Sequence, residues 1–253
     1  MTTSTRFQLK PMEHLGSPDT KQRFNRSLFS EVAPKYDFIT KALSFGRDAA
    51  WKRNLIATLP ELPDPSCADL ACGTGDITRM LAERYPAGKI AGLDLTPAML
   101  EIAHERTAES RIDYMEGSMA DLPFDNGSID IVTGGYALRN APSLDQTITE
   151  ISRVLRPGGT AAFLDFSKPG NRFGQLLSHA ALKFWGGFWG LVLHGNPDVY
   201  GYIADSLKFY PDRTTLRLRF AAHGFTLHSS TRFFGGLLEV VQFKKTGTGN
   251  HAA

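Results

Sequence analysis

Cysteine is scarce in this chain, and long apolar runs are absent. The two cysteines, Cys67 and Cys72, flank the end of one expected strand, where a mutual disulfide would distort the turn. A reducing, cytoplasmic environment is therefore expected. Residues 1–17 lack the apolar centre of a signal peptide, and no apolar stretch reaches the length that spans a bilayer. The sequence thus predicts neither a secreted nor a transmembrane protein.

A strong charge of one sign is also missing. The chain carries 28 Lys and Arg against 26 Asp and Glu, a formal net charge of +2, and no basic cluster stands out. This argues against a nucleic-acid binder, whose affinity depends on clustered cations that face phosphates. No pair of cysteines or histidines has metal-ligand spacing, so no metal is expected. Peripheral contact with a membrane and a homodimer are both left open.

The apolar content of 42% suffices for one substantial core, and a single domain is expected over residues 20–245. Small and polar residues dominate both ends, so 1–19 and 246–253 are predicted to be disordered tails. Three regions divide the domain. They are an N-terminal helical cover at 22–59, a cofactor-binding core at 67–167 and a helical lid or substrate region at 173–219.

The core alternates short apolar runs with amphipathic stretches, which is the pattern of strand–helix–strand units on a parallel sheet. Ser143 and Gln146 have capping-box spacing at the start of the clearest helix, and the run 156–159, Arg-Pro-Gly-Gly, is expected to end that helix in a turn. Gly235 and Gly236 join two strands near the C-terminus. These patterns predict an α/β fold: a doubly wound, mostly parallel, Rossmann-like sheet with an antiparallel C-terminal strand pair and helical cover, which binds ligands at the carboxyl ends of its strands. The expected strands are 67–71, 89–94, 111–116, 129–134, 160–166, 225–233 and 237–243, and the first two core helices are 77–85 and 98–109.

A glycine-rich turn follows the first expected strand. Its glycines let the backbone approach a ligand closely. Dinucleotide enzymes place G-x-G-x-x-G at such a turn, whereas here the third glycine is missing and Asp76 adds a negative charge that would repel a phosphate. A phosphate-free ligand with a cationic amino-acid end is tolerated, and S-adenosylmethionine has this chemistry. The turn residues expected to bind it are Ala71, Gly73, Thr74 and Gly75.

The ends of neighbouring strands supply further cofactor ligands. Asp94, with Leu95 beside it, follows the first strand at about the 20-residue offset at which an acid meets ribose hydroxyls. The alternative is that Asp94 only caps the next helix. Asp69 is expected to orient the methionine end, or else to be a buried carboxylate satisfied at the turn. Ser118 and Met119 are expected at the adenine, although Met119 also suits ordinary core.

Several longer runs carry a more specific resemblance. The run 69–76 is common to class I methyltransferases, whereas Leu-Arg-Asn at 138–140 and Ser-Lys-Pro at 167–169 are much narrower. Together with other runs, they resemble the ubiquinone and menaquinone biosynthesis C-methyltransferase family over residues 31–236. The resemblance implies S-adenosylmethionine-dependent methylation of a ring carbon in a prenylated demethylquinol. The other matching runs are 32–37, 43–46, 51–53, 120–124, 153–159, 200–203, 210–211 and 224–225.

A ring carbon attacks a methyl group only if a neighbouring phenol is partly ionised. Arg139 and Asn140, just past the fourth strand, are expected to stabilise such a phenolate, because a positive charge favours the ionised form. Tyr136 is expected to hydrogen-bond the ring oxygen, and Tyr36 to close over the ring. The competing interpretations are a surface ion pair with Asp145 or Glu150 for Arg139 and ordinary packing for both tyrosines. His194 is a weaker candidate for a base.

Two other functions stay open at this point. Ser118 stands where the family usually has an acidic residue, and Gly135-Tyr136 replaces the family's Ser-Phe. These departures leave room for a small-molecule O- or C-methyltransferase of secondary metabolism, or for a cofactor-binding homologue that does not methylate. The aromatic segment 184–189 is predicted either to line a pocket for a lipid tail, to lie on a membrane face or to pack in the core.

Overall fold

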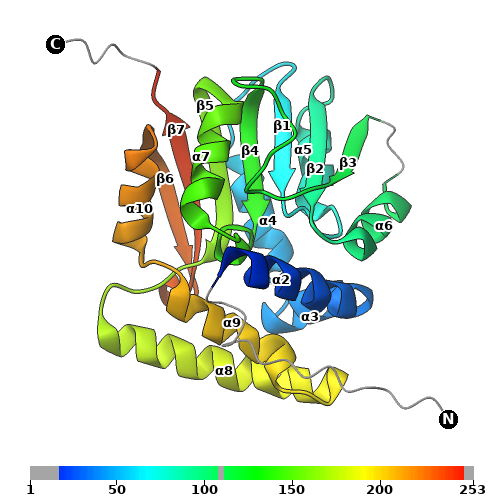
Figure 1. Ribbon diagram of the computed structural model, residues 1–253, viewed down its shortest axis with the longest axis vertical. Coiled ribbons are helices and arrows are strands. Elements are labelled where there is room, and N and C mark those ends of the chain that lie inside the picture. Colours follow the sequence, from blue (N-terminus) through cyan, green and yellow to red (C-terminus); the bar gives the residue numbers. More distant parts are fainter. Residues whose placement is uncertain (1–16, 108–110, 248–253) are drawn as a thin grey trace.

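The computed structural model describes residues 17–107 and 111–247, and its centre is a seven-stranded sheet (Figure 1). The strand order is β3-β2-β1-β4-β5-β7-β6. β1 to β5 are parallel, and β7 is antiparallel to β5 and β6, so the predicted fold class is confirmed. The strands are β1 (Ser66–Leu70), β2 (Lys89–Asp94), β3 (Ile112–Glu116), β4 (Ile129–Gly135), β5 (Leu155–Phe166), β6 (Phe225–Phe233) and β7 (Leu238–Lys245).

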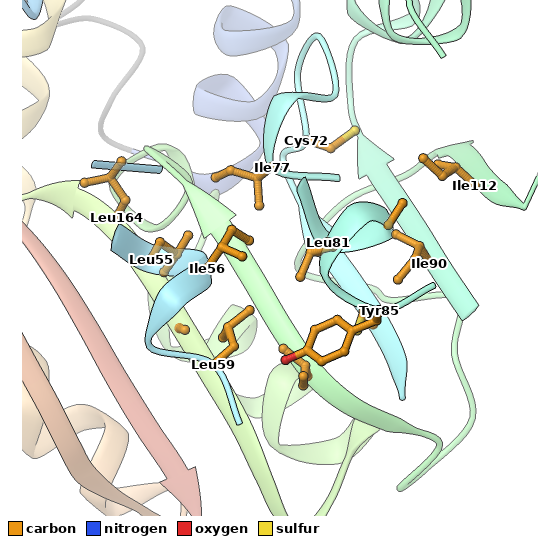
Figure 2. Packing of buried hydrophobic residues seen from close by; sticks show 14 of the residues in the cluster. Leu55, Ile56, Leu59, Cys72, Ile77, Leu81, Tyr85, Ile90, Ile112 and Leu164 are labelled. Atoms are coloured by element: carbon orange, nitrogen blue, oxygen red, sulfur yellow. The ribbon is translucent and has the colours of Figure 1, made fainter. Parts of the chain in front are cut away.

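Consecutive strand residues point to opposite faces of the sheet, so the sheet separates two cores. On β5, Ala162 and Leu164 belong to the core that includes α4 and α5, whereas Ala161 and Phe163 belong to the core that includes α7 and α10. Figure 2 shows part of the first core, with Leu55 and Leu81 among its labelled side chains. The helices of these two layers are α4 (Asp48–Ala57), α5 (Asp76–Arg84), α6 (Pro97–Glu105), α7 (Leu144–Val154) and α10 (Arg213–Ala222).

A third group of helices lies together at one end of the sheet (Figure 1). It consists of α2 (Pro18–Val32), α3 (Tyr36–Leu43), α8 (Arg172–His194) and α9 (Asp198–Phe209). Phe24, Leu28 and Val32 of α2 are buried against Tyr202 of α9 and Met99 of α6. This group covers the carboxyl ends of the parallel strands, where ligands bind in this class of sheet. Short 3₁₀ turns complete the fold at Ala33–Lys35, Leu138–Asn140 and Phe234–Gly236.

Three predicted boundaries need correction. α2 already begins at Pro18, so the last part of the predicted tail 1–19 is helical, because Ser17 caps the helix and Pro18 suits its first position. α6 ends at Glu105 rather than at 109. The run 156–159 does not form a separate turn: β5 starts at Leu155, which pairs with Ile129, and a register shift accommodates the intervening residues. Residues 1–16, 108–110 and 248–253, which include most of both predicted tails, lie outside the described residues.

Two expectations about the cell environment can be compared with the structure. Cys67 and Cys72 are both buried and unpaired. Among the residues described, no helix combines the length and the apolar character that crossing a membrane requires.

Candidate active site

The turn after β1 adopts the left-handed backbone that its glycines favour. Gly73 has φ +56° and Gly75 has φ +81°, and Ala71 has φ +50° without being a glycine. A Cβ at Gly75 would lie 2.3 Å from the hydroxyl of Tyr114, whereas one at Gly73 would meet only the ring of Tyr36, at 3.9 Å. Gly75 therefore serves packing, and Gly73 keeps the space above the turn open.

Asp94 at the end of β2 ties this turn to the start of α6. Its Oδ2 accepts a hydrogen bond from the Gly73 amide at 2.8 Å, and its Oδ1 accepts one from the Thr96 amide at 2.8 Å. Burial raises the pKa of Asp94, and these hydrogen bonds counter the shift. Asp94 thus bonds the residue that precedes α6 but does not cap the helix, whose N-cap Thr96 has no side-chain cap hydrogen bond. Each carboxylate oxygen can accept a second hydrogen bond. The ribose role stays a prediction that this geometry permits.

A small cavity of about 70 Å³ lies beside the turn and the ends of β2 and β4. Most of the predicted cofactor ligands line it, but Asp69, Thr74 and Gly75 do not. The lining residues that the sequence predicts are Tyr36, Ala71, Gly73, Asp94, Leu95, Ser118, Met119, Tyr136 and Asn140.

Asp69 lies under the turn and is 1% exposed, which agrees with the alternative interpretation of a buried carboxylate, and its role at the methionine end stays a prediction. The hydroxyls of Thr78 and Thr133 donate to its two oxygens at 2.7 and 2.8 Å. Burial raises the pKa of Asp69 to about 6. Thr74 is likewise directed away, because its hydroxyl donates to Asp37 at 3.1 Å. Asp69 thus joins β1 to α5 and β4, and Thr74 joins the turn to α3.

Asp76 is not the uncompensated negative charge that the sequence indicates. Lys52 lies 2.9 Å from its Oδ2 and Arg79 lies 2.5 Å from its Oδ1. Burial opposes ionisation, but these two cations hold the pKa of Asp76 below its usual value. The argument that Asp76 repels phosphate is therefore wrong. Phosphate is disfavoured for another reason: the Gly73 amide that would bind it is already donated to the carboxylate of Asp94.

A second, larger cavity of about 460 Å³ adjoins the first. Apolar and aromatic side chains from α2, α3, α8 and α9 make up most of its lining. Arg139 is its one charged lining residue among those described. Phe29, Tyr36, Tyr136 and Asn140 line both cavities and form their shared wall. Three of the four predicted catalytic residues thus lie between the two cavities, and the fourth lines the larger one.

Arg139 is 4% exposed, which excludes the surface ion pair considered for it. Asp145 pairs with Arg219 instead, and Glu150 pairs with Arg153. The Arg139 Nη1 donates to the hydroxyl of Ser206 at 2.6 Å, and its Nε is buried without a partner. Its guanidinium carbon lies 5.3 Å from the centre of the Phe166 ring and 5.6 Å from that of Tyr202. No described carboxylate lies within ion-pair distance of this guanidinium. The nearby buried Asp165 accepts from the Arg139 backbone amide at 3.1 Å and interacts with the Arg139 charge, so that charge is offset in part and still has no direct ionic contact.

The other three predicted catalytic side chains are Tyr136, Asn140 and Tyr36. The first two are hydrogen-bonded within the protein, and the third is un-ionised at neutral pH. The Tyr136 hydroxyl donates to Asp48 Oδ1 at 2.7 Å, so its proton is not offered to a substrate oxygen as predicted. The amide of Asn140 donates to the Tyr136 carbonyl at 2.9 Å, and its Oδ1 lies 3.0 Å from the Tyr202 hydroxyl. Burial raises the pKa of Tyr36 to about 12. All three side chains therefore contribute to the shared wall as neutral groups.

His194 does not reach either cavity lining, so the structure gives no support for its role as a base. Its Nε2 lies 2.9 Å from the Tyr200 hydroxyl, and its Nδ1 lies 3.8 Å from Glu31. Burial lowers the pKa of His194. It therefore joins α8 to α9 and α2.

Backbone strain is concentrated around the two cavities. Apart from glycines, the described residues with positive φ are Phe45, Ala71, Tyr136 and Phe234, at φ between 48° and 57°. Each of them lines one or both cavities. Strained backbone of this kind persists where the surrounding structure enforces it and is typical of ligand sites.

The family model described as the ubiE/COQ5 methyltransferase family matches residues 18–243. The chain belongs to this family. It is 36% identical over 215 residues to the demethylmenaquinone methyltransferase of Thermus thermophilus, a match that covers 82% of this chain and 96% of that protein. It is 31% identical over 244 residues to the ubiquinone/menaquinone biosynthesis C-methyltransferase UbiE of Ectopseudomonas mendocina, covering 90% and 93%.

Solved structures support the fold of this methyltransferase. A chain of the complex between the Haloferax volcanii Trm112 methyltransferase activator and a putative methyltransferase superposes with a TM-score of 0.68 at 17% identity, covering 90% of this chain and 99% of that one. The geranyl diphosphate C-methyltransferase of Streptomyces coelicolor, solved with S-adenosyl-L-homocysteine, gives 0.59 at 13% identity, covering 78% of each chain. The ubiE/COQ5 family and this fold identify the protein as an S-adenosylmethionine-dependent methyltransferase.

The residues of the small cavity fit that cofactor chemically. Asp94 has acceptor sites left for hydroxyls, and the absence of a Cβ at Gly73 keeps the space between the turn and Tyr36 open. The volume of about 70 Å³ is below the roughly 300–1,000 Å³ typical of ligand sites. Admission of a whole nucleoside therefore requires the lining, to which α2 contributes Asn25 and Phe29, to open.

Sequence reasoning missed the contribution of α2. Asn25 donates to the Asn140 carbonyl at 2.8 Å, and Lys21 donates to the carbonyls of Arg139 and Ala141 at 3.0 and 2.6 Å. These bonds place α2 over the small cavity. Nothing in the local sequence of α2 distinguishes a polar side chain that bonds a distant backbone from one that faces solvent.

Proposed function

We propose that this enzyme methylates a ring carbon of a prenylated demethylquinol of the menaquinone or ubiquinone type. The observation that carries the proposal is the composition of the large cavity, an apolar and aromatic space with one charged residue, Arg139. A phenolic head beside Arg139 and an apolar tail in the rest of the space match this lining. Relatives named for demethylmenaquinone methylation and for ubiquinone/menaquinone C-methylation support the same substrate class.

We assign the small cavity to the methyl donor, which supplies an electrophilic methyl group when bound. Asp94 would accept the ribose hydroxyls, and Ser118 and Met119 would lie at the adenine, where Met119 also packs on the core. Leu95, Ala71 and Gly73 would line the remaining surface. Thr74, Gly75 and Asp69 do not line this cavity and would fix the shape of the turn through contacts outside it. The region 67–167 thus serves as the cofactor-binding core of one domain spanning 20–245.

Arg139 is the residue that would activate the acceptor. A guanidinium charge without a carboxylate partner lowers the pKa of a phenol bound next to it, and the ionised ring is the better carbon nucleophile. The shared wall of Phe29, Tyr36, Tyr136 and Asn140 would hold ring and donor at attack distance. Such positioning can supply about 7–11 kcal/mol of the barrier. Tyr36 and Tyr136 act as neutral groups, because burial raises the pKa of each.

Incubation with a methyl-labelled donor and a reduced demethylmenaquinone tests this proposal. We expect label in the quinol product, with the methyl group attached to ring carbon in its NMR spectrum. Cells lacking the protein should accumulate a quinone lighter by one methyl group in their mass spectra. Methylation of a phenolic oxygen, or no transfer to the demethylquinol while a simple phenol is methylated, would reject it.

A further inference from the structure

The outward face of α8 is apolar along its whole length. Its exposed large residues are Phe173, Leu176, Leu177, Phe184, Phe188, Leu191 and Val192, and they are between 48% and 78% exposed. They recur at helical spacing, so they share one face of a helix that runs about 28 Å from Phe173 to Val192. In Figure 1, α8 lies along the lower edge of the molecule, with α9 above it and the sheet beyond.

The polar residues of α8 face inward instead. Lys183 pairs with Asp205 and Asp198 of α9 at 2.8 and 3.2 Å. Gly186 and Gly190 lie on the same inner face, where a Cβ at either would come 2.6 Å from a backbone carbonyl of Tyr200 or Asn196. Leu182, Trp189 and Leu193 of α8 pack on the cores, so the exposed side of this helix is apolar in addition to its inner side, whereas the exposed side of a usual surface helix is polar. An exposed apolar face of this extent marks a contact surface.

The large cavity opens within this apolar surface. Phe45, Phe184 and Phe234 line the cavity and are also 63%, 75% and 47% exposed. Phe45 stacks on Trp185 of α8 with ring centres 5.1 Å apart, and Phe234 lies 6.0 Å from Phe45. Phe38 of α3, 54% exposed, contacts Trp189 at 5.7 Å. The mouth of the substrate cavity and the exposed face of α8 therefore form one continuous apolar surface.

Three exposed cations lie on α8 or close in sequence to the exposed residues of this surface. α8 contains no acidic residue, and Arg172 at its first position is exposed. Lys41 lies between Phe38 and Phe45 in sequence, and Arg47 follows closely; both are exposed. In the described parts of the chain, none of these three cations has an acidic partner. An apolar stripe bordered by cations complements the acyl chains and anionic headgroups of a lipid bilayer.

We propose that the outer face of α8, with Phe38, Phe45 and Phe234, docks the enzyme on the surface of an anionic lipid bilayer, with the large cavity opening toward the acyl chains. The proposed lipid contact depends only on these exposed residues and not on the proposed function. Delivery of a prenylated acceptor directly from the bilayer into the cavity rests in addition on the proposed function. No segment crosses the membrane in this arrangement, because the helix lies along the surface.

Vesicle flotation of the full chain tests the docking without reference to activity. We use vesicles of phosphatidylcholine alone and of phosphatidylcholine with phosphatidylglycerol at about 2:1. The wild type should float with both and more completely with the anionic ones. The double variant Leu177→Glu, Leu191→Glu should partition at least about tenfold less, because both side chains lie on the outer face and away from the cavity lining.

Two controls keep the result specific. Leu218→Glu changes a residue of α10 that is 65% exposed and should float like the wild type. Lys41→Glu with Arg172→Glu should remove only the preference for anionic vesicles.

Equal flotation of the double α8 variant and the wild type, or no flotation of the wild type, overturns the proposal. So does light scattering that gives a wild-type dimer and a monomeric α8 variant, since the face then joins two copies of the chain. Unchanged turnover of a tail-free quinol by the α8 variant separates a docking defect from a failure of the proposed chemistry.

Discussion

The hydroxyl of Tyr136 donates a 2.7 Å hydrogen bond to Asp48 Oδ1, and Asp48 Oδ2 lies 2.6 Å from Lys52. This contact joins the wall between the two cavities to the first turn of α4. The phenol proton of Tyr136 is therefore donated to Asp48 and not to a ligand. Burial, together with the charge of Asp48, raises the pKa of Tyr136 well above its usual value. Tyr136 is therefore a positioning residue whose ring is held by a charged acceptor on a neighbouring helix.

Tyr136→Phe should lower the free energy of unfolding by about 1.5–3 kcal/mol, the usual contribution of a hydrogen bond to a charged group. We expect kcat to fall about tenfold with little change in donor affinity, because the ring loses its fixed position. Denaturant unfolding and steady-state kinetics measure both. Asp48→Asn combined with Tyr136→Phe should be clearly less harmful than the sum of the single changes; strict additivity would mean that the two side chains do not act together.

Arg139→Met should reduce kcat by about 10²–10³, because it removes the charge that stabilises the ionised phenol. Affinity for the donor, measured by isothermal titration, should stay within about twofold. Ser206→Ala is the matched control, since it removes the hydroxyl that accepts from Arg139 Nη1 and leaves the guanidinium in place. We expect a much smaller loss for that variant. A similar fall for both would indicate that Arg139 acts only through packing.

Asp94→Asn should weaken binding of S-adenosylhomocysteine by about tenfold or more, since one carboxylate oxygen is lost. The decisive comparison uses the analogue that lacks the ribose 3′-hydroxyl. The wild type should bind it about tenfold less tightly than the parent compound. The variant should discriminate weakly. If wild type and variant discriminate equally, Asp94 only joins Gly73 to Thr96.

Asp69 predicts a pH dependence of stability. Its pKa is about 6 in the folded protein against 3.8 ordinarily, so at pH 5 the folded state holds a proton that the unfolded state has lost. The contribution of this group to stability is therefore fully present below pH 3.8 and is lost as pH rises through 6. The loss at neutral pH is about 3 kcal/mol. Asp69→Asn mimics the protonated acid, so its denaturation midpoint should depend less on pH between 4 and 7 than that of the wild type. Parallel pH curves for the two proteins would contradict this.

Gly75→Ala should destabilise the protein by more than Gly158→Ala. Both glycines have positive φ, +81° and +77°, so both variants share a strain cost of about 1 kcal/mol. A Cβ at Gly158 meets nothing within 4 Å, whereas one at Gly75 meets the buried Tyr114 hydroxyl. We expect an additional loss of about 1–3 kcal/mol at Gly75. Urea unfolding measures the difference, and equal losses would show that Tyr114 moves aside freely.

The sheet was predictable because its signals are local. Apolar runs, turn glycines and caps such as Ser143 each determine a few residues, and β2 matches its expected range from Lys89 to Asp94 in full. Errors occurred where a distant partner decides the outcome. Leu155 extends β5 because Ile129 pairs with it, and Asp76 is neutralised because Lys52 lies on another helix. Neither relation has a trace in the neighbouring sequence.

In the candidate site, too, features set by local sequence were predictable and features set by distant partners were not. The residues at strand ends, such as Gly73, Asp94 and Asn140, were placed correctly at a cavity, because the topology of the sheet brings those ends together. The direction of each side chain was less predictable. Asp69 points under the turn toward two threonines, and the Tyr136 proton is directed to Asp48. Asn25 and Phe29 reach the site from α2 through tertiary packing alone.

Phe29, Tyr36, Tyr136 and Asn140 each line both cavities. We therefore expect a molecule that orders these side chains in one cavity to change the affinity of the other cavity for its own ligand. Linkage requires the factor to be the same in both directions. If the demethylated donor stays bound, it will change the affinity for the methylated product by some factor. The methylated product will then change the affinity for the demethylated donor by the same factor.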